Sequence, residues 1–244
     1  MPHLIETLSV IEVIDPIASG MTEPYRCRLS DDNLYAVKGR QALIKGLISE
    51  TVCAHLARKM GIPIPDFAIA HIDQVLITAA GDPQFNSSIG AGYGFASLWI
   101  EPTQPLPRSL IPELDSRLMA TIYAFDHWIK NGDRSLTEHG GNPNLMIELG
   151  SNSLIAFDHN LAFSESYSPT ELEVHACREA WLDESKNLVF RGECERKFDE
   201  ASSGLRHFID DLPTDWLDAE DGLADQIAKT LARSASDQFW DEMG

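Results

Sequence analysis

The chain has 244 residues, of which 43% are hydrophobic, enough to bury the core of one large domain or two small ones. Asp and Glu number 38 against 19 Lys and Arg, which gives a formal net charge of −19. This charge repels phosphate backbones and anionic lipid, so we expect neither a nucleic-acid partner nor a membrane partner.

Two further features of the sequence concern its cellular compartment. No apolar run approaches the length of a membrane span, and the opening MPHLIETLSV lacks the basic and apolar regions of a secretory leader. The cysteines have no CxxC spacing, which favours reduced, partly buried thiols over a zinc site or a disulfide framework. We therefore expect a cytoplasmic protein. The four cysteines are Cys27, Cys53, Cys177 and Cys194.

The first hundred residues contain most of the strand signals. Over residues 8–40, alternating apolar residues separated by Pro, Ser, Gly, Thr, Asp and Asn predict short strands in an antiparallel meander. One helix over residues 42–60 follows, and further strands come after it. In that helix Leu43, Leu47, Ala54 and Ala57 form one apolar stripe. The predicted strands cover residues 8–14, 25–29, 34–39, 66–72, 74–78 and 94–100.

The segment 101–112 carries four prolines and marks a boundary, because proline suits neither a regular helix nor a central strand. Beyond it we predict a helix over 113–130 that Asn131-Gly132 stops, two strands around a turn at 150–152, and acidic helices from 168 onward. The sequence predicts an α+β protein with a sheet-rich lobe over residues 1–100 and a mainly helical lobe over 101–244.

The first candidate group for chemistry is a lysine and a glutamate. Alternation places Lys38 on one strand face with Leu34 and Ala36, where an ammonium can hold phosphate oxygens or simply reach water at a strand end. Glu50 lies within the apolar stripe of the next helix, where an unpaired carboxylate is costly. Lys38 is the natural partner of Glu50, unless Glu50 lies at the stripe's edge and reaches water.

A second candidate group follows the predicted helix that ends at residue 130. Asp133 comes after Asn131-Gly132, Asn144 precedes the apolar strand LMI, and Asp158 closes the strand LIAF. A carboxylate and an amide at the rims of paired strands can bind Mg²⁺, and a second carboxylate can orient or deprotonate a hydroxyl. Each of these residues taken singly is also a common turn former.

The order of these residues, with Lys on a third strand, Glu on the next helix, then Asp, Asn and Asp, resembles that of protein-kinase-like enzymes. In detail the chain resembles the HipA-like kinases, through segments that span most of its length. The segments are YAVKGR, ISETVCAHLARKMGIPIPDFAIA, FASLWIEPTQPLP, FDHWIKNGDR, GGNPNLMI, IAFDHNLAF and LPTDWL.

The resemblance implies a two-lobed kinase fold and an ATP- and Mg²⁺-dependent transfer of phosphate. It implies that Lys38 contacts the α- and β-phosphates and pairs with Glu50, and that Ala36 helps to cover the adenine. Asp133 would be the catalytic aspartate, with Asn144 and Asp158 as Mg²⁺ ligands. The adenine would hydrogen-bond to the backbone of a hinge formed by Ser97, Leu98, Trp99, Ile100 and Glu101.

The chain departs from the family pattern in three places. Asn144 follows Asp133 by eleven positions, compared with about five in protein kinases, so SLTEHGG enlarges this loop and Asn142 competes for the metal. The phosphate-covering loop has no GxGxxG and offers Gly20, with Ser19 and Thr22 as possible hydroxyl donors. His and Asn follow Asp158 instead of Phe and Gly, so no in/out switch is assumed.

Two other functions remain open on sequence grounds. Asp126-His127 and Asp158-His159, with His139, could ligate two metals in a phosphohydrolase. A pseudokinase that binds nucleotide or a partner protein without turnover is the second alternative. The acceptor can be a protein Ser or Thr, the enzyme itself or a small molecule, and the resemblance favours protein.

Overall fold

A computed structural model describes residues 5–18 and 21–244 and divides the chain into two compact units. The first consists of Met1–Val52, Pro65–Glu101 and Arg206–Asp221, and the second of Cys53–Ile64, Pro102–Leu205 and Gly222–Gly244. The structure is 47% helix and 20% strand, with the sheet in the N-terminal region and helices in the C-terminal part, which confirms the α+β prediction. The lobe boundary at residues 100 and 101 stays a prediction.

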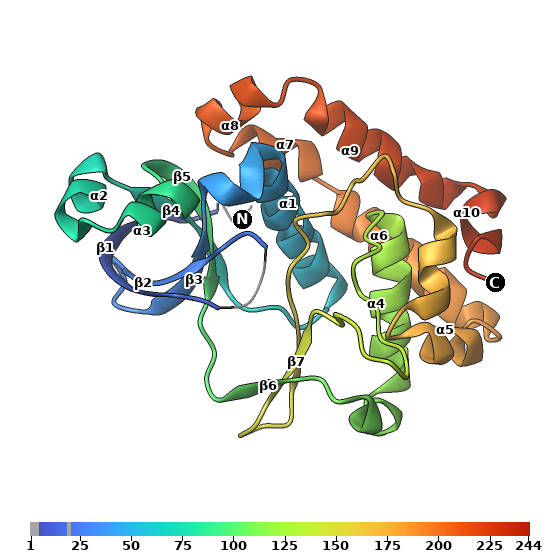
Figure 1. Cartoon of the computed structure of the whole chain (residues 1–244). Helices are drawn as coiled ribbons and strands as arrows, with labels where there is room; N and C mark the ends of the chain where they lie inside the picture. Colours follow the sequence, from blue (N-terminus) through green and yellow to red (C-terminus); the bar gives the residue numbers. More distant parts are fainter. Residues whose placement is uncertain (1–4, 19–20) are drawn as a thin grey trace. The chain divides into compact units, whose positions relative to one another are not determined.

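The first unit is built around a closed five-stranded barrel in the order β1-β2-β3-β5-β4 (Figure 1). Neighbouring strands run antiparallel except β1 and β4, whose parallel pairing closes the barrel. The predicted meander over the first three strands is thus confirmed, and the closure adds to it. The strands are β1 (Thr7–Pro16), β2 (Tyr25–Leu29), β3 (Leu34–Lys38), β4 (Phe67–Ile72) and β5 (Gly92–Leu98).

Alternation along the strands fills the barrel interior. In β2, Tyr25, Cys27 and Leu29 are at most 1% exposed, while the arginines between them are only half-buried. In β3, Tyr35 and Val37 point inward, so Leu34, Ala36 and Lys38 share the outer, half-buried face. Short helices α2 (Gln74–Ala80), α3 (Pro83–Ser88), α7 (Leu205–Asp210) and α8 (Thr214–Ala219) complete this part of the chain.

The prediction of a strand over residues 74–78 is wrong, because this segment forms helix α2. Asp73 caps the helix by accepting a hydrogen bond from the Val75 amide at 2.7 Å, and Gly81 ends it in a left-handed conformation. The apolar run Val-Leu-Ile-Thr suits either state, and these two caps decide in favour of helix.

Helix α1 (Leu43–Met60) matches the predicted helix within one residue. Its burial differs from the expected single stripe, because every residue from 46 to 54 is buried and Leu43 is 70% exposed. Residues up to Val52 belong to the first unit and those from Cys53 to the second. Because α1 is buried on more than one face over residues 46–54, its pattern is not amphipathic.

The second unit is mainly helical and also contains a small antiparallel sheet in the order β6-β7-β8. Helix α4 lies at its centre, with Met119 to Trp128 all buried and Trp128 stacked on Phe198 at 4.4 Å between ring centroids. The helix predicted over 113–130 begins at Ser116, because Asp115 caps it, and ends at Trp128. The elements are β6 (Thr103–Pro105), α4 (Ser116–Trp128), β7 (Leu145–Glu148), β8 (Leu154–Ala156), α5 (Arg178–Glu184), α6 (Leu188–Ser202), α9 (Leu223–Leu231) and α10 (Asp237–Asp241).

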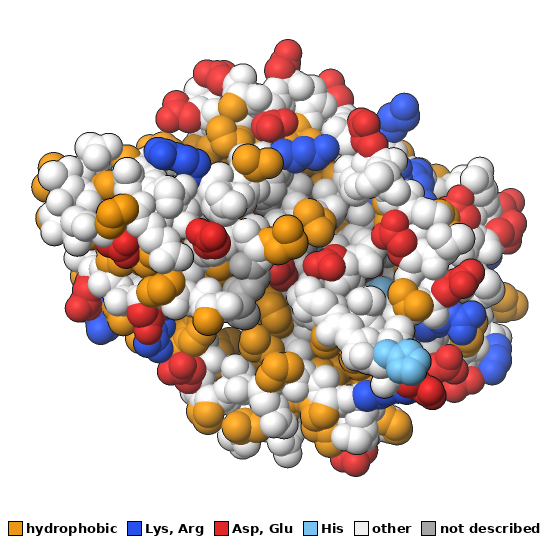
Figure 2. Space-filling model, viewed as in Figure 1, with side chains coloured by type: hydrophobic (Ala, Val, Ile, Leu, Met, Phe, Trp, Pro, Cys, Tyr) orange, Lys and Arg blue, Asp and Glu red, His pale blue; other side chains and the backbone are white. Residues whose placement is uncertain are grey.

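The sequence predicts a negatively charged protein with reduced, partly buried thiols. Carboxylates are spread over the face seen in Figure 2 and outnumber the basic side chains on it. All four cysteines are buried, and burial raises the pKa of the Cys27 and Cys194 thiols to about 12. No helix within the described ranges, 5–18 and 21–244, is long and apolar enough to be a membrane span.

Candidate functional site

Lys38 and Glu50 form a close ion pair within the first unit. The Lys38 Nζ donates to Glu50 Oε1 at 2.6 Å, and the two side chains are 12% and 3% exposed. Strand β3 directs Lys38 away from the barrel interior, and α1 presents Glu50 one turn after Leu47. The pairing expected from the sequence is therefore present, with its ammonium fixed in position. Its contact with phosphates remains a prediction.

The predicted adenine hinge, residues 97–101, covers the end of β5 and the three residues after it. The Leu98 amide donates to the Asp66 carbonyl at 2.7 Å, and the Trp99 amide donates to the Leu34 carbonyl at 2.8 Å. These two N–H groups are used within the barrel and are not available to an adenine. The amides of Ile100 and Glu101 donate to no described residue, so they are the hinge donors that the geometry leaves for a nucleotide.

The remaining nucleotide-site predictions in the first unit have different outcomes. Ala36 lies on the outer face of β3 and pairs with Ser97 of β5, which keeps it beside the predicted hinge. Thr22 is 8% exposed. Ser19 and Gly20 lie outside the described residues.

In the second unit, Asp133 and two asparagines form a hydrogen-bonded cluster. Asp133 Oδ2 accepts from Asn144 Nδ2 at 3.0 Å and from Asn142 Nδ2 at 3.4 Å. Burial raises the pKa of Asp133 above its ordinary value and the negative charge of Asp158 adds to this, while the bond from Asn144 opposes it. Asp133 Oδ1 accepts no hydrogen bond from a described residue, so it can take one from a hydroxyl.

The hairpin of β7 and β8 brings Asn144 and Asp158 to the same rim. The Phe157 amide donates to the Asn144 carbonyl at 3.2 Å, which ties the residue before β7 to the segment after β8. Both residues have left-handed backbones, with φ of 46° at Asn144 and 59° at Asp158, a conformation that Asn and Asp tolerate better than most residues.

Oxygen donors of this kind fit a hard cation such as Mg²⁺. Asn144 is 3% exposed and its Oδ1 accepts no hydrogen bond from a described residue, whereas Asn142 is exposed. An amide oxygen that accepts no hydrogen bond can serve as a ligand of such a cation. The geometry therefore favours Asn144 over Asn142 as the metal ligand, and both roles remain predictions.

Arg134, next to Asp133, is a residue that the sequence argument missed. It is fully buried, and its Nε donates to Asp126 Oδ2 at 2.6 Å. Its Nη1 donates to the carbonyls of Pro143 and Asn144, at 3.1 and 2.5 Å, and its Nη2 lies 3.0 Å from His159 Nε2. One guanidinium thus binds the backbone at Asn144 and contacts the side chain of His159, the residue after Asp158.

Asp126 is the counter-charge of this network. It also accepts from Asn131 Nδ2 at 2.8 Å and lies 2.9 Å from His175 Nε2. Burial alone would raise the pKa of Asp126, but the charge of Arg134 and the hydrogen bond with His175 outweigh it and hold the pKa well below its ordinary range. Asp126 stands between Phe125 and His127 in an apolar helix, where a carboxylate requires a buried cation. This position was the signal in the sequence that could have revealed a buried arginine.

The enlarged loop that separates Asp133 from Asn144 folds as a small hairpin. The Ser135 amide donates to the Asn142 carbonyl at 3.1 Å, and Thr137 pairs with Gly140. A Cβ at Gly141 would come within 2.4 Å of the Ser135 carbonyl oxygen, so the close approach of the two arms requires glycine there. The insertion is therefore an ordered part of the predicted catalytic loop.

The residues of the phosphohydrolase alternative do not converge on a metal site. Asp126 binds Arg134, and His127 lies 2.8 Å from the Tyr167 hydroxyl and 3.1 Å from the Phe239 carbonyl. Burial lowers the pKa of His127 to about 4, and His139 is exposed on the loop hairpin. In the part of the chain that the structure describes, no three His, Cys, Asp or Glu side chains could hold a metal ion.

Comparison with solved structures identifies the fold as protein-kinase-like. A proinflammatory kinase of Helicobacter pylori, CtkA, aligns with a TM-score of 0.59 over 97% of this chain and 98% of its own, at 10% sequence identity. The Golgi casein kinase with Mn and ADP bound aligns with a TM-score of 0.47 over 98% of this chain and 72% of its own, also at 10% identity.

The sequence defines the family within this fold class. The model of the HipA-like kinases matches residues 10–243, and the chain belongs to that family. The resemblance noted from the motifs is thereby confirmed, and the protein is a kinase-like phosphotransferase by family. No curated protein matches the chain.

Proposed function

We propose that the chain transfers the γ-phosphoryl group of ATP, with Mg²⁺, to a Ser or Thr hydroxyl of a protein or of the chain itself. The observation that carries the proposal is the cluster in which Asp133 accepts a hydrogen bond from Asn144 and the charge of Asp158 contributes to raising the pKa of Asp133. It supplies a carboxylate oxygen for the acceptor hydroxyl next to oxygen ligands for a cation, the combination that phosphoryl transfer needs.

The residues have separate roles in this mechanism. Lys38, held by Glu50, offsets the charge of the α- and β-phosphates, and the amides of Ile100 and Glu101 bind the adenine edge. Asn144 and Asp158 would hold Mg²⁺, which when bound neutralises phosphate charge. Asp133 orients the acceptor hydroxyl through Oδ1 and accepts its proton, while its Oδ2 stays bonded to the two asparagines.

The raised pKa of Asp133 supports this role. A carboxylate with a pKa above its ordinary value is a stronger base than an exposed Asp. Arg134 contributes indirectly, because its bonds to Pro143 and Asn144 fix the loop that carries the proposed metal ligand.

The test is transfer of labelled phosphate from ATP to a general protein acceptor and to the chain itself, with and without Mg²⁺. Asp133→Asn should lower the rate by about 10² to 10⁴, the range for loss of a general base, while calorimetry still shows ATP binding. Asp158→Asn should weaken the Mg²⁺-dependent part of ATP binding. A double variant of Asp133→Asn and Asp158→Asn that transfers phosphate at the wild-type rate would refute the assignment.

The same measurements separate the alternatives. A pseudokinase would bind ATP without transferring phosphate in any of these variants, and a small-molecule acceptor would give transfer only when that molecule is added. Mass spectrometry of the incubated protein detects transfer to the chain itself.

A further inference from the structure

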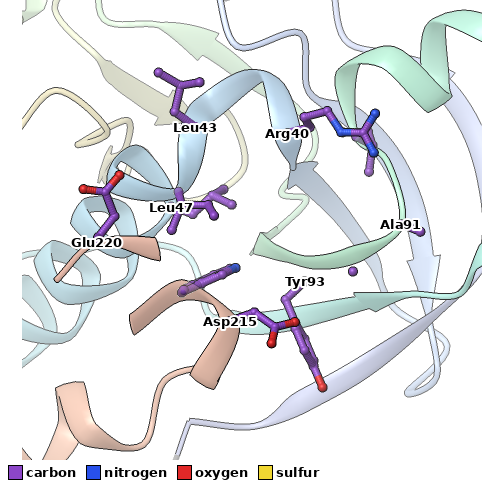
Figure 3. A pocket seen from close by; sticks show the side chains of 11 residues that line it. Arg40, Leu43, Leu47, Ala91, Tyr93, Asp215 and Glu220 are labelled. Carbon is purple, nitrogen blue, oxygen red and sulfur yellow. The ribbon is translucent and has the colours of Figure 1, made fainter. Parts of the chain in front are cut away.

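The first unit contains a pocket beside α1 with a volume of about 540 Å³ (Figure 3). Leu47, Ile89 and Trp216 contribute to its apolar lining, and Arg40 and Asp215 at its rim are exposed to solvent. Because water satisfies these charged groups, the pocket indicates no particular occupant. The contacts that point to a further role lie in the second unit.

In the second unit, residues 171–176 support the predicted catalytic loop through two backbone hydrogen bonds. The Leu136 amide donates to the Val174 carbonyl at 2.9 Å. The Ala176 amide donates to the Arg134 carbonyl at 3.0 Å. This short antiparallel pairing restrains the backbone that directly follows the predicted catalytic aspartate.

The same segment also contacts the residue before the predicted catalytic aspartate. The Glu171 carboxylate occupies the space that a Cβ at Gly132 would need, so glycine leaves room for it there. Glu171 Oε1 accepts a hydrogen bond from the Ser168 amide at 3.1 Å in a capping box, which holds the carboxylate in this position. The loop is therefore supported on both sides of Asp133.

His175 adds a side-chain contact to this support. It is 5% exposed, and its Nδ1 accepts a hydrogen bond from the Cys177 amide at 3.0 Å, which assigns the ring proton to Nε2. Nε2 therefore donates to Asp126 Oδ2, which lies 2.9 Å away. Burial lowers the pKa of His175 below its ordinary value, so the ring is neutral at pH 7.

Asp126 connects His175 to a predicted metal ligand. Its Oδ2 accepts from Arg134 Nε at 2.6 Å as well as from His175 Nε2. Arg134 Nη1 donates in turn to the carbonyl of Asn144. Because a buried carboxylate oxygen is destabilised when it loses a donor, we expect Asp126 to turn when the His175 N–H is removed and to move Arg134 with it.

We propose that His175 is a positioning residue of the predicted metal site. Through Asp126 and Arg134 it fixes the backbone of Asn144, the predicted Mg²⁺ ligand. The backbone bonds of its two neighbours restrain the loop after Asp133. In this role His175 needs no contact with the nucleotide, the metal ion or the acceptor hydroxyl. The role rests on the proposed function, which makes Asn144 a metal ligand.

Two buried histidines allow a matched comparison. His175→Asn is too short to reach Asp126, while His175→Gln is long enough to keep an N–H donor for it. The control is His127→Asn, because His127 is also buried and its ring nitrogens contact the Tyr167 hydroxyl and the Phe239 carbonyl, both outside the loop. A merely structural role for His175 predicts the same outcome for both asparagine variants.

The measurement is calorimetric titration of the full chain with ATP at a series of Mg²⁺ concentrations. His175→Asn should raise about tenfold the Mg²⁺ concentration at which ATP binding is half-maximally enhanced, the lower end for loss of a partner behind a metal ligand. ATP binding without Mg²⁺ should stay unchanged, and His175→Gln and His127→Asn should keep the wild-type Mg²⁺ dependence. An equal Mg²⁺ dependence of His175→Asn and His127→Asn would overturn the role of His175.

A second measurement uses the wild-type chain and does not depend on the folding of any variant. If holding the loop favours Mg²⁺ binding, Mg²⁺ must by linkage stabilise the contacts that hold the loop. Adding Mg²⁺ to the ATP-bound chain should therefore slow hydrogen exchange, by up to about tenfold, at the amides of Ala176 and Cys177, which donate to the Arg134 carbonyl and to His175 Nδ1. Unchanged exchange at both amides would overturn the proposal.

Neither measurement requires phosphate transfer. If both give the expected result and no preparation transfers phosphate, the proposed transfer fails and the positioning role of His175 stands. If no preparation binds ATP more tightly with Mg²⁺ than without it, the metal site and the role of His175 are both overturned.

Discussion

Removing one member of the Lys38–Glu50 pair should destabilise the protein much more than removing both. We expect Glu50→Leu and Lys38→Met each to lower the free energy of unfolding by about 3–5 kcal/mol, because each removes the counter-charge that lies closest to a buried charge. The double variant should lie within about 1 kcal/mol of the wild type, since it leaves neither charge. Lys38→Met should be the worse single change, because Glu50 is 3% exposed and Lys38 is 12% exposed.

The magnitude follows from the geometry of the pair. At 2.6 Å and an effective dielectric constant of about 20, the Coulomb attraction is about 6 kcal/mol. Taking both ions out of water costs several kcal/mol per ion, so the attraction and the desolvation nearly cancel. A single substitution removes the attraction and leaves one desolvation cost, which explains why the singles and the double differ.

The assay is urea unfolding of the four proteins, followed by tryptophan fluorescence, with the slope m required to stay constant. The matched control is the exposed pair of Arg28 and Glu12, at 2.9 Å with side chains 36% and 55% exposed, where we expect a coupling of at most about 1 kcal/mol. Single-variant losses at Lys38 and Glu50 that simply add in the double variant would refute the burial argument.

Four further predictions concern the second unit. Arg134→Met should lower the free energy of unfolding by about 3–5 kcal/mol, measured by urea titration, because Asp126 would keep a buried charge without a cation; a loss under 1 kcal/mol would contradict this. Because the pKa of Asp126 is lower in the folded protein than in the unfolded chain, its ionised form stabilises the fold. This contribution is fully present above the unfolded pKa of about 4 and is lost as the pH falls toward the folded pKa. Asp126→Asn should therefore make the free energy of unfolding less dependent on pH in the acid range. The raised pKa of Asp133 predicts that NMR titration of its carboxyl gives a midpoint above that of an exposed Asp, and lower in Asp158→Asn. Gly141→Ala should open the loop hairpin and slow phosphate transfer without unfolding the protein, whereas Gly150→Ala, with open space around its Cβ position, should do neither.

Local patterns in the sequence were sufficient for most elements of the fold. The alternation in residues 25–29 and 34–38, with turn-forming residues between them, specified two paired strands because inward and outward side chains meet different surroundings. The segment 74–78 was predicted wrongly because three apolar residues in a row fit both a strand and a short helix, and the cap from Asp73 was not weighed.

The candidate site, like the fold, was predicted from the sequence only in part. Lys38 and Glu50 were identified because a charge in an apolar pattern needs a partner, and the pair is present. Arg134 was missed, because an arginine in a polar loop has no periodicity that reveals burial. Its role appears only when α4, the loop and the residues before β7 pack around one guanidinium.

The sequence alone determined the α+β class, the family and the order of the candidate site residues, since motifs and periodicity are local properties of the chain. Tertiary structure decided the closure of the barrel by β1 and β4, the burial of Arg134 and the pocket beside α1. The physical reason is that burial and hydrogen-bond partnership depend on residues far apart in the chain, and a side chain's desolvation and charge partners exist only after those residues have packed together.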